Sequence, residues 1–138
     1  MALEAFREDP ARWDADKQRI LGASPEGVFD LSHREGAIVP GQWIRAEEEG
    51  RVLGYAWLDI TWGYAPVLFA VAPAAQGRGV GSFLLDQVEA EARREGLAYV
   101  FNAIPDAHPD PEGLARWLTE RGFEPSQSDG KLLRRRVR

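Results

Sequence analysis

Three glycines at alternate positions constrain the fold of this chain more than any other feature. They are Gly77, Gly79 and Gly81, in the stretch VAPAAQGRGVGSFLL, between a continuously apolar run and an amphipathic run. Glycine loses more backbone entropy on folding than any other residue. A cluster of glycines at a strand-to-helix junction therefore indicates that another group approaches the backbone closely there. The alternative is a tight turn, which rarely needs three glycines in this arrangement.

The runs on either side of the loop predict a parallel pair of strands. PVLFAVA (66–72) is apolar throughout, which is typical of a strand buried on both faces. After the loop, apolar residues at i, i+3, i+4 and i+8 from Val80 predict a helix that ends at Gly96. A second apolar run over 97–104 predicts another buried strand. A strand, a helix and a strand in this order predict parallel strands joined by a right-handed crossover.

The remaining patterns complete an α/β fold. They predict a helix from Asp9-Pro10 to Gly22, a β-hairpin over 42–60 that turns at Gly50, a helix over 110–122 and a last strand over 131–137. With 138 residues the chain is expected to form one domain over residues 1–138, with a mixed sheet and helices on both faces.

Composition excludes several classes of function. The net charge of −5 gives no reason to expect a nucleic-acid partner, and the basic end RRRVR is typical of a solvated edge strand. The absence of cysteine excludes a thiol nucleophile and a thiolate metal site. No apolar run is long enough to cross a membrane, and no secretory leader is recognisable, so we expect no membrane association and a cytoplasmic location.

The position of the glycine loop predicts that it binds a phosphate. The amides of residues 77–82 lie at a helix N-terminus, where unpaired N–H groups and the helix dipole attract an anion. Gln76 adds a side-chain donor and Arg78 a cation. A P-loop would need a lysine that GVGSF lacks. A dinucleotide fold is disfavoured because serine replaces the third glycine and too little chain follows the loop.

The loop resembles the signature of a known superfamily. Gln76-Gly-Arg-Gly79-Val-Gly81 is similar to the Gln/Arg-x-x-Gly-x-Gly/Ala signature of the GCN5-related N-acetyltransferases (GNAT). The hairpin EEEGRVLGYAWL, the exit Val71-Ala-Pro73 and the ending LTERGF resemble the same family. In that family the loop holds the pyrophosphate of acetyl-CoA.

The resemblance implies acetyl-CoA as co-substrate, without a metal, and assigns its contacts. The strands over 66–72 and 97–104 would separate, with the acyl thioester between them. The implied contacts are Phe69, Ala70 and Val71 for the pantetheine arm, and Gln76, Gly77, Arg78, Gly79, Val80, Gly81 and Ser82 for the pyrophosphate.

One position departs from the family pattern. Many relatives carry a tyrosine, which protonates the leaving thiolate, four residues before the glycine of the closing Gly-Phe, where this chain has Leu118. Two other residues are candidates for catalysis. His108 suits a general base, since the ordinary pKa of histidine is about 6.5. Tyr64 lies beside the central strand, where acceptor sites are lined; packing on the hairpin is its alternative role.

Two further assignments complete these expectations. The alternating acids and histidine of PDAHPDPEG resemble a metal site, but Asp110 is better explained as a helix cap. Trp62 is a candidate for an acceptor-pocket wall or a homodimer contact, and His33 is expected at the surface. The predicted function is transfer of an acetyl group to a primary amine of a small molecule or peptide. A non-catalytic acyl-CoA-binding or sensor domain is the alternative.

Overall fold

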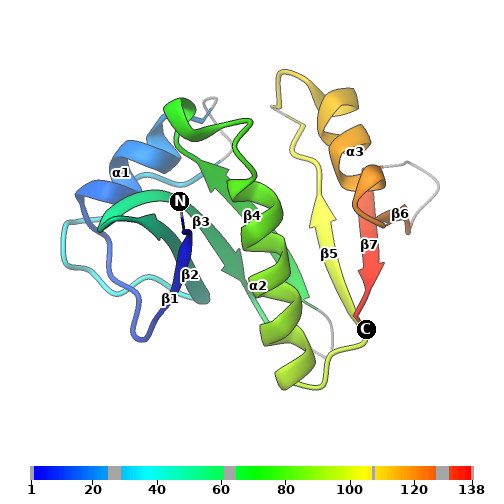
Figure 1. Ribbon diagram of the computed structural model, residues 1–138, viewed down its shortest axis with the longest axis horizontal. Helices are drawn as coiled ribbons and strands as arrows, with labels where there is room; N and C mark the ends of the chain where they lie inside the picture. Colours follow the sequence, from blue (N-terminus) through cyan, green and yellow to red (C-terminus); the bar gives the residue numbers. More distant parts are fainter. Residues whose placement is uncertain (1, 25–28, 61–64, 107, 127–130, 138) are drawn as a thin grey trace.

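A seven-stranded mixed sheet forms the middle of the molecule, in the order β1-β2-β3-β4-β5-β7-β6 (Figure 1). The computed structural model describes residues 2–24, 29–60, 65–106, 108–126 and 131–137. Neighbouring strands are antiparallel except β4 and β5, which are parallel. The strands are β1 Glu4–Glu8, β2 Gln42–Glu48, β3 Arg51–Leu58, β4 Ala65–Val71, β5 Tyr99–Ala103, β6 Glu124–Pro125 and β7 Leu132–Arg136. The mixed α/β fold expected from the sequence is confirmed.

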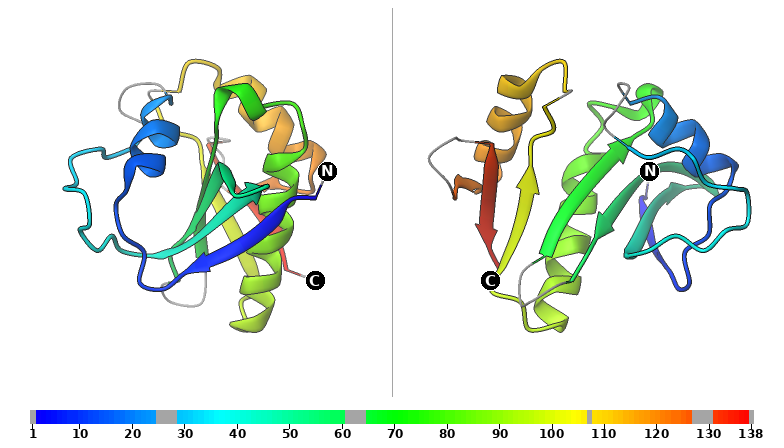
Figure 2. Two further views of the ribbon diagram at one scale, coloured as in Figure 1. Left: turned by 60° about the vertical axis from the view of Figure 1, so that its left-hand side comes forward. Right: turned by 180° about the vertical axis from the view of Figure 1, so that it is seen from behind.

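Helices lie on both faces of this sheet. They are α1 Ala15–Gly22, α2 Val80–Arg94 and α3 Pro111–Glu120, with a short 3₁₀ turn, η1, over Pro73–Ala75. A Cβ atom on Gly54 of β3 would lie 3.2 Å from side chains of α2. The next residue, Tyr55, projects to the other face, where Lys17 Nζ of α1 lies 5.0 Å from its ring centre. Figure 2 shows α1 and α2 on these opposite sides.

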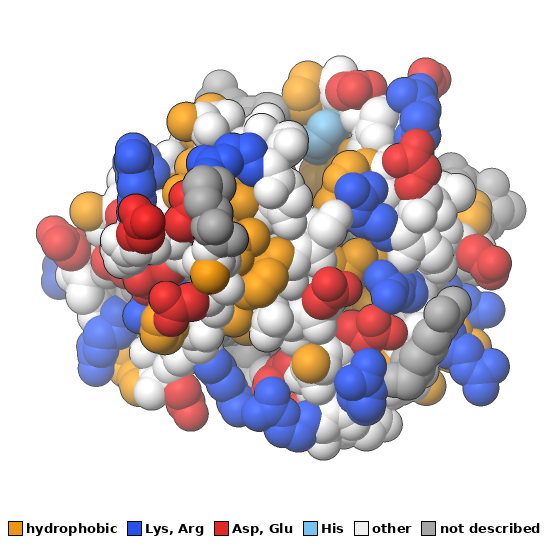
Figure 3. Space-filling model, in the orientation of Figure 1, with side chains coloured by type: hydrophobic (Ala, Val, Ile, Leu, Met, Phe, Trp, Pro, Cys, Tyr) orange, Lys and Arg blue, Asp and Glu red, His pale blue; other side chains and the backbone are white. Residues whose placement is uncertain are grey.

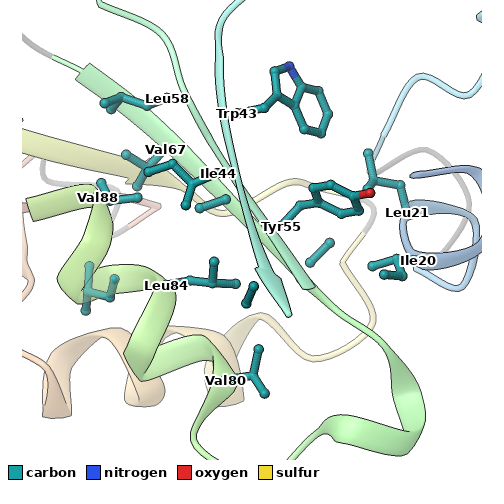
Figure 4. Close-up of a cluster of buried hydrophobic side chains, with 14 of the residues drawn as sticks. Ile20, Leu21, Trp43, Ile44, Tyr55, Leu58, Val67, Val80, Leu84 and Val88 are labelled. Carbon is teal, nitrogen blue, oxygen red and sulfur yellow. The ribbon is translucent and has the colours of Figure 1, made fainter. Parts of the chain in front are cut away.

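Helices α1 and α2 each cover a separate half of the hydrophobic core. On one face Leu84 and Val88 of α2 are fully buried at 0% exposure, close to Val67 and Leu58 (Figure 4). On the other face Tyr55 and Trp43 lie opposite Ile20 and Leu21 of α1 (Figure 4). Burying a side chain of this size contributes about 1.5–3 kcal/mol. The stripe read along 80–88 is therefore what attaches α2 to the sheet.

The prediction of a helix from Asp9-Pro10 to Gly22 is wrong over its first half. Residues Glu4–Glu8 form β1, which pairs with β2. The helix begins only after Asp14, whose carboxylate accepts a hydrogen bond of 2.8 Å from the N–H of Lys17. Asp9 begins no helix because the chain after it bonds to residues 36–39: the N–H of Trp13 donates to the carbonyl of Ala37 at 2.8 Å, and the N–H of Val39 to that of Ala11 at 2.9 Å.

The other element predictions are confirmed, with one change at the C-terminal end. The hairpin turns through Glu49 and Gly50, both at positive φ, as a two-residue turn of this kind requires. Asp110 caps α3 by accepting from the N–H of Gly113 at 3.0 Å. The basic strand β7 is not an edge strand, because β5 pairs with one side of it and β6 with the other. Arg135 donates to Glu89 of α2 at 2.8 Å.

Candidate active site at the opening of the sheet

The central parallel pair of strands separates after a short contact. Within the described chain, β4 and β5 pair only where Ala65 and Pro66 meet Val100 and Phe101. Asn102, 4% exposed, then donates its Nδ2–H to the carbonyl of Val67 at 2.9 Å. This side chain satisfies the carbonyl at which the ladder ends. Beyond it the two strands diverge (Figure 1), as the resemblance implied.

Main-chain groups of β4 point into this opening. The carbonyl of Pro66 and the N–H of Ala72 both bond toward β3. Because direction alternates along a strand, the groups of Phe69 and Val71 point toward the opening. Those of Ala70 point to β3, where Ala70 lies opposite Tyr55. Of the three residues expected to contact the pantetheine arm, Phe69 and Val71 therefore direct their main-chain groups into the opening, and Ala70 does not.

The glycine loop presents free amides at the end of the opening. Gly77 and Gly79 have φ of 77° and 85°, a region that favours glycine. Gly79 caps α2 without a side-chain hydrogen bond, and its carbonyl accepts from Phe83. The amides of the first helical turn, from Val80 to Ser82, consequently lack helical acceptors. They and the helix dipole form a cradle for an anion.

The third glycine serves packing rather than backbone conformation. A Cβ atom on Gly81 would lie 2.9 Å from Cζ2 of Trp117 in α3. Even a methyl group at position 81 would therefore require Trp117 to move. The ring of Trp117 also lies 6.1 Å from that of Phe69, and the guanidinium of Arg121 stacks on it at 3.9 Å.

A groove of about 580 Å³ joins these features. It runs from the loop along the opening to α3, and Figure 3 shows hydrophobic and histidine side chains in a hollow on this face. Of the predicted contacts, it contains Phe69, Val71, Gln76, Gly77, Gly79, Val80, Gly81 and Ser82, and it also contains His108. The groove is large enough for an extended arm ending in phosphates.

Two arginines near the groove differ in whether they line it. Arg78 lies outside the groove lining and pairs with Glu48 of β2 at 3.1 Å. Arg121 lines the groove, donating from Nε to Ser82 Oγ at 2.9 Å. Sequence reasoning missed Arg121. Its position four residues after Trp117, on the same helical face, is the signal that could have found it.

A second cavity, of about 250 Å³, lies on the α1 side of β4. We call it the aromatic cavity. It meets the groove at three shared residues, Phe29, Leu68 and Phe69. Its walls include Trp13, Phe29, Trp43, Tyr55, Trp57, Phe69 and the side of Ala70. The groove and the aromatic cavity thus adjoin each other at the open edge of β4.

The comparison with family models decides the classification of this site. The model of the Acetyltransferase (GNAT) family matches residues 4–123. The chain belongs to the GNAT family of acetyltransferases.

Solved structures of GNAT proteins share the fold. An acetyltransferase assigned to the GNAT family from Desulfovibrio desulfuricans has a TM-score of 0.74 at 20% identity, over 99% of this chain and 100% of that one. The N-acetylglutamate synthase of Neisseria gonorrhoeae, solved with coenzyme A and L-arginine, gives 0.70 at 21% identity over 98% and 33%. The ribosomal-protein-S18-alanine N-acetyltransferase of Escherichia coli gives 0.64 at 14% identity over 97% and 94%. No curated protein sequence matches the chain.

The structure describes only some of the residues that were considered for catalysis in this GNAT chain. Tyr64 and Trp62 lie outside the described residues. His108 lines the groove, and its Nδ1 accepts from the N–H of Asp110 at 3.0 Å. A neutral ring with that bond keeps its proton on Nε2. Leu118 is fully buried at 0% exposure, so it belongs to the core, as its helical stripe predicts.

His33, which was expected at the surface, is half-buried. His33 lines the aromatic cavity, stacks against Trp13 at 4.9 Å and lies 3.8 Å from Asp30. Hydrogen bonds from Ser32 lower the pKa of the Asp30 carboxyl. Sequence reasoning missed this side of the site because the segment before β2 shows neither helical nor strand periodicity.

Two aspartates of the segment that resembles a metal site have partners within the protein. Asp106 accepts from Lys131 at 2.7 Å, which lowers the pKa of that carboxyl, and Asp110 caps α3. Among the residues described, no three His, Asp or Glu side chains gather closely enough to hold a metal ion. Nor is any helix in the described ranges long and apolar enough to span a membrane.

Proposed function

We propose that this GNAT chain transfers the acetyl group of acetyl-CoA to a primary amine, by direct attack while both substrates are bound. One observation carries the proposal. The groove and the aromatic cavity meet at Leu68 and Phe69, on the open edge of β4. A thioester in the groove and an amine in the cavity would therefore meet at the open edge of one strand. Such positioning is a large part of catalysis between two substrates.

The described groups fit the chemistry of acetyl-CoA. The amides of Val80, Gly81 and Ser82 suit the pyrophosphate, as does the positive-φ loop before them. The main-chain groups of Phe69 and Val71 suit the amides of the pantetheine arm. Gln76 donates to the carbonyl of Val71 at 3.3 Å and so supports the same edge.

Three further residues are proposed to contact acetyl-CoA at the edge of the groove. Arg121 is our addition, as a cation for the phosphates, because it lines the groove beside Ser82. Arg78 and Ala70 stay predictions from the family resemblance. Arg78 would have to exchange Glu48 for a phosphate, and Ala70 would contribute its side-chain face rather than main-chain groups.

The transfer leaves one proton and one negative charge to be accommodated. The amine nitrogen bonds to the carbonyl carbon, the carbon–sulfur bond breaks, the sulfur leaves as thiolate and the nitrogen loses a proton. The nitrogen's proton passes to water, and Nε2–H of neutral His108 donates a hydrogen bond that stabilises the leaving thiolate without giving up its proton, since Nδ1 already accepts from Asp110. The general-base role predicted for His108 would need a ring with a free nitrogen lone pair facing the amine, and it stays a prediction. Tyr64 stays a prediction as the proton donor to the sulfur. A thiol has a pKa of about 8.5, so its thiolate leaves tolerably even without an acid.

Two measurements test this proposal. Calorimetry is expected to show binding of acetyl-CoA and of free CoA. Release of free thiol from acetyl-CoA is then expected with at least one amine of a panel containing small amines, amino acids, polyamines and peptide N-termini. Absence of acetyl-CoA binding would reject the proposal.

A second function is favoured by one observation. Leu118 occupies, fully buried, the position at which many relatives carry the tyrosine acid. A protein that binds acetyl-CoA tightly yet releases no thiol with any amine would be a non-catalytic acyl-CoA sensor. A homodimer stays a prediction; analytical ultracentrifugation with and without acetyl-CoA tests it.

A further inference from the structure

We propose that the aromatic cavity binds a small arylalkylamine as the acetyl acceptor, with the ring inside the cavity and the amine at the opening beside Phe69. This inference rests on the proposed function and names its acceptor class. It follows from three properties of the cavity: its walls, its charges and one buried hydroxyl.

The walls are aromatic and are held in place. Trp43 and Trp57 both donate their indole N–H to the carbonyl of Pro40, at 3.0 and 2.9 Å. Trp43 meets Tyr55 edge-to-face at 5.9 Å between ring centres. Aromatic rings favour such offset contacts with another ring. A cavity of about 150 Å³ is enough for benzene, so about 250 Å³ admits one ring with a short alkyl arm.

The charges disfavour the other common classes of amine. Among the described lining residues there is no lysine or arginine, so an amino acid would leave its carboxylate without a cation. Asp30 is the single described carboxylate of the lining, with its side chain 69% exposed at the rim. One rim carboxylate matches one arriving ammonium group. A polyamine would bring further ammonium groups into the cavity, where the described lining offers no second carboxylate to pair with them.

A buried hydroxyl lies behind the cavity wall, covered by Leu21 (Figure 4). Tyr55 is 2% exposed, and its hydroxyl has no hydrogen-bond partner within the described chain. Figure 4 shows this hydroxyl directed toward Leu21, another residue of the cavity lining. Burial raises the pKa of the Tyr55 hydroxyl, so at neutral pH it can both donate and accept. An unpartnered buried hydroxyl is costly, and a ring whose own hydroxyl reached it by displacing the Leu21 side chain (Figure 4) would relieve that cost.

The first experiment compares acceptors. Initial rates of thiol release are measured with tyramine, phenethylamine, spermidine and glutamate. We expect kcat/KM to be highest for tyramine, then phenethylamine, and at least about tenfold lower for the other two, since desolvating unpaired charge is expensive. A higher kcat/KM for spermidine or glutamate would overturn the inference while leaving the proposed function intact.

Binding separates this inference from the proposed function. If acetyl-CoA binds but no amine reacts, tyramine is titrated into the CoA complex and followed by tryptophan fluorescence and calorimetry. Saturable tyramine binding supports the cavity assignment, and absence of binding rejects it. Failure of acetyl-CoA itself to bind rejects the proposed function instead.

The second experiment uses paired variants. Tyr55→Phe removes only the hydroxyl, so it should reduce the preference for tyramine over phenethylamine by about fivefold. Trp57→Ala should raise KM for both amines about tenfold, as loss of an aromatic anchor does. Phe6→Ala is the matched control, because Phe6 is 37% exposed on β1, under the guanidinium of Arg45.

The readouts distinguish a site effect from unfolding. Each variant should keep the acetyl-CoA affinity and thermal transition expected of a folded chain. The inference is wrong if Trp57→Ala and Phe6→Ala give the same KM, or if Tyr55→Phe lowers kcat/KM for both amines equally.

Discussion

The groove and the aromatic cavity meet at one strand but are built from different parts of the chain. The groove takes its binding groups mainly from the backbone: the amides after Gly79 and the main chain of Phe69 and Val71. The aromatic cavity takes its walls from side chains of β2, β3, β4 and the segments around α1. Backbone groups suit the part of a substrate that is common to a family. Side chains can vary without changing the backbone conformation, so they suit the part of a substrate that differs between family members.

The largest expected effect tests the backbone half of this comparison. Gly79→Val places a β-branched residue at a φ of 85° and a side chain before the free amides. Acetyl-CoA binding should weaken by roughly 100-fold, measured by calorimetry. No atom lies within 4 Å of the new Cβ position, so the cost to folding comes from the strain at that φ alone and should lower the thermal transition by several degrees without unfolding the chain. Unchanged affinity would remove the loop from the binding site.

The next effect concerns the boundary between the two halves. Asn102→Ala removes the donor to the carbonyl of Val67 at the point where β4 and β5 separate. Leaving a buried carbonyl unpaired should lower the free energy of unfolding by about 1–3 kcal/mol, measured by urea denaturation. Asn102→Asp is a useful companion, since it keeps the size but not the donor. If the alanine variant is as stable as the wild type, the opening is held by something other than this bond.

A smaller effect separates the roles of the glycines. Gly81→Ala brings a Cβ atom to 2.9 Å from Trp117, which must shift. Acetyl-CoA binding should weaken by about three- to tenfold, less than for Gly79→Val, since such overpacking costs about 1–3 kcal/mol before relaxation. Adding Trp117→Ala should restore part of the loss if the clash is the cause. Equal losses in the two glycine variants would contradict this division of roles.

The smallest expected effect concerns the aromatic cavity, and it appears only at high pH. The pKa of the Tyr55 hydroxyl is raised by burial, so the folded state holds that proton more tightly than the unfolded state does. Its contribution to stability is complete below the unfolded pKa of about 10 and is lost as the pH rises above it, by at most about 1.4 kcal/mol per pH unit. Urea denaturation between pH 9 and 11 should show a shallower decline for Tyr55→Phe than for the wild type. Parallel declines would show that the hydroxyl is hydrated.

The groove was largely predictable because its signals are contiguous. Alternate glycines between an apolar strand and an amphipathic helix predict free amides, and the structure places Gly77 and Gly79 at positive φ. The role of Gly81 was not predictable. Its partner, Trp117, lies far along the chain, and only the packing of α3 beside α2 brings the two together.

The N-terminal segment was less predictable for a related reason. Two aspartates could cap a helix there, and local propensity does not choose between Asp9 and Asp14. Hydrogen bonds between residues 11–13 and 37–39 select the later cap, because they hold the chain between the two aspartates outside any helix. Long-range pairing of this kind leaves only a weak local pattern.

The sequence by itself determined the order of the elements from β2 to α3, the α/β class and a glycine loop at a helix N-terminus, since these depend on periodicity, capping residues and glycines that are close in the chain. The tertiary structure decided which main-chain groups of β4 are left open, that Arg121 rather than Arg78 lines the groove, and that an aromatic cavity meets the groove at Phe69. The physical reason is the range of the interactions. Backbone conformation is set largely by neighbours in sequence, whereas a cavity is the space left between side chains that only folding brings together.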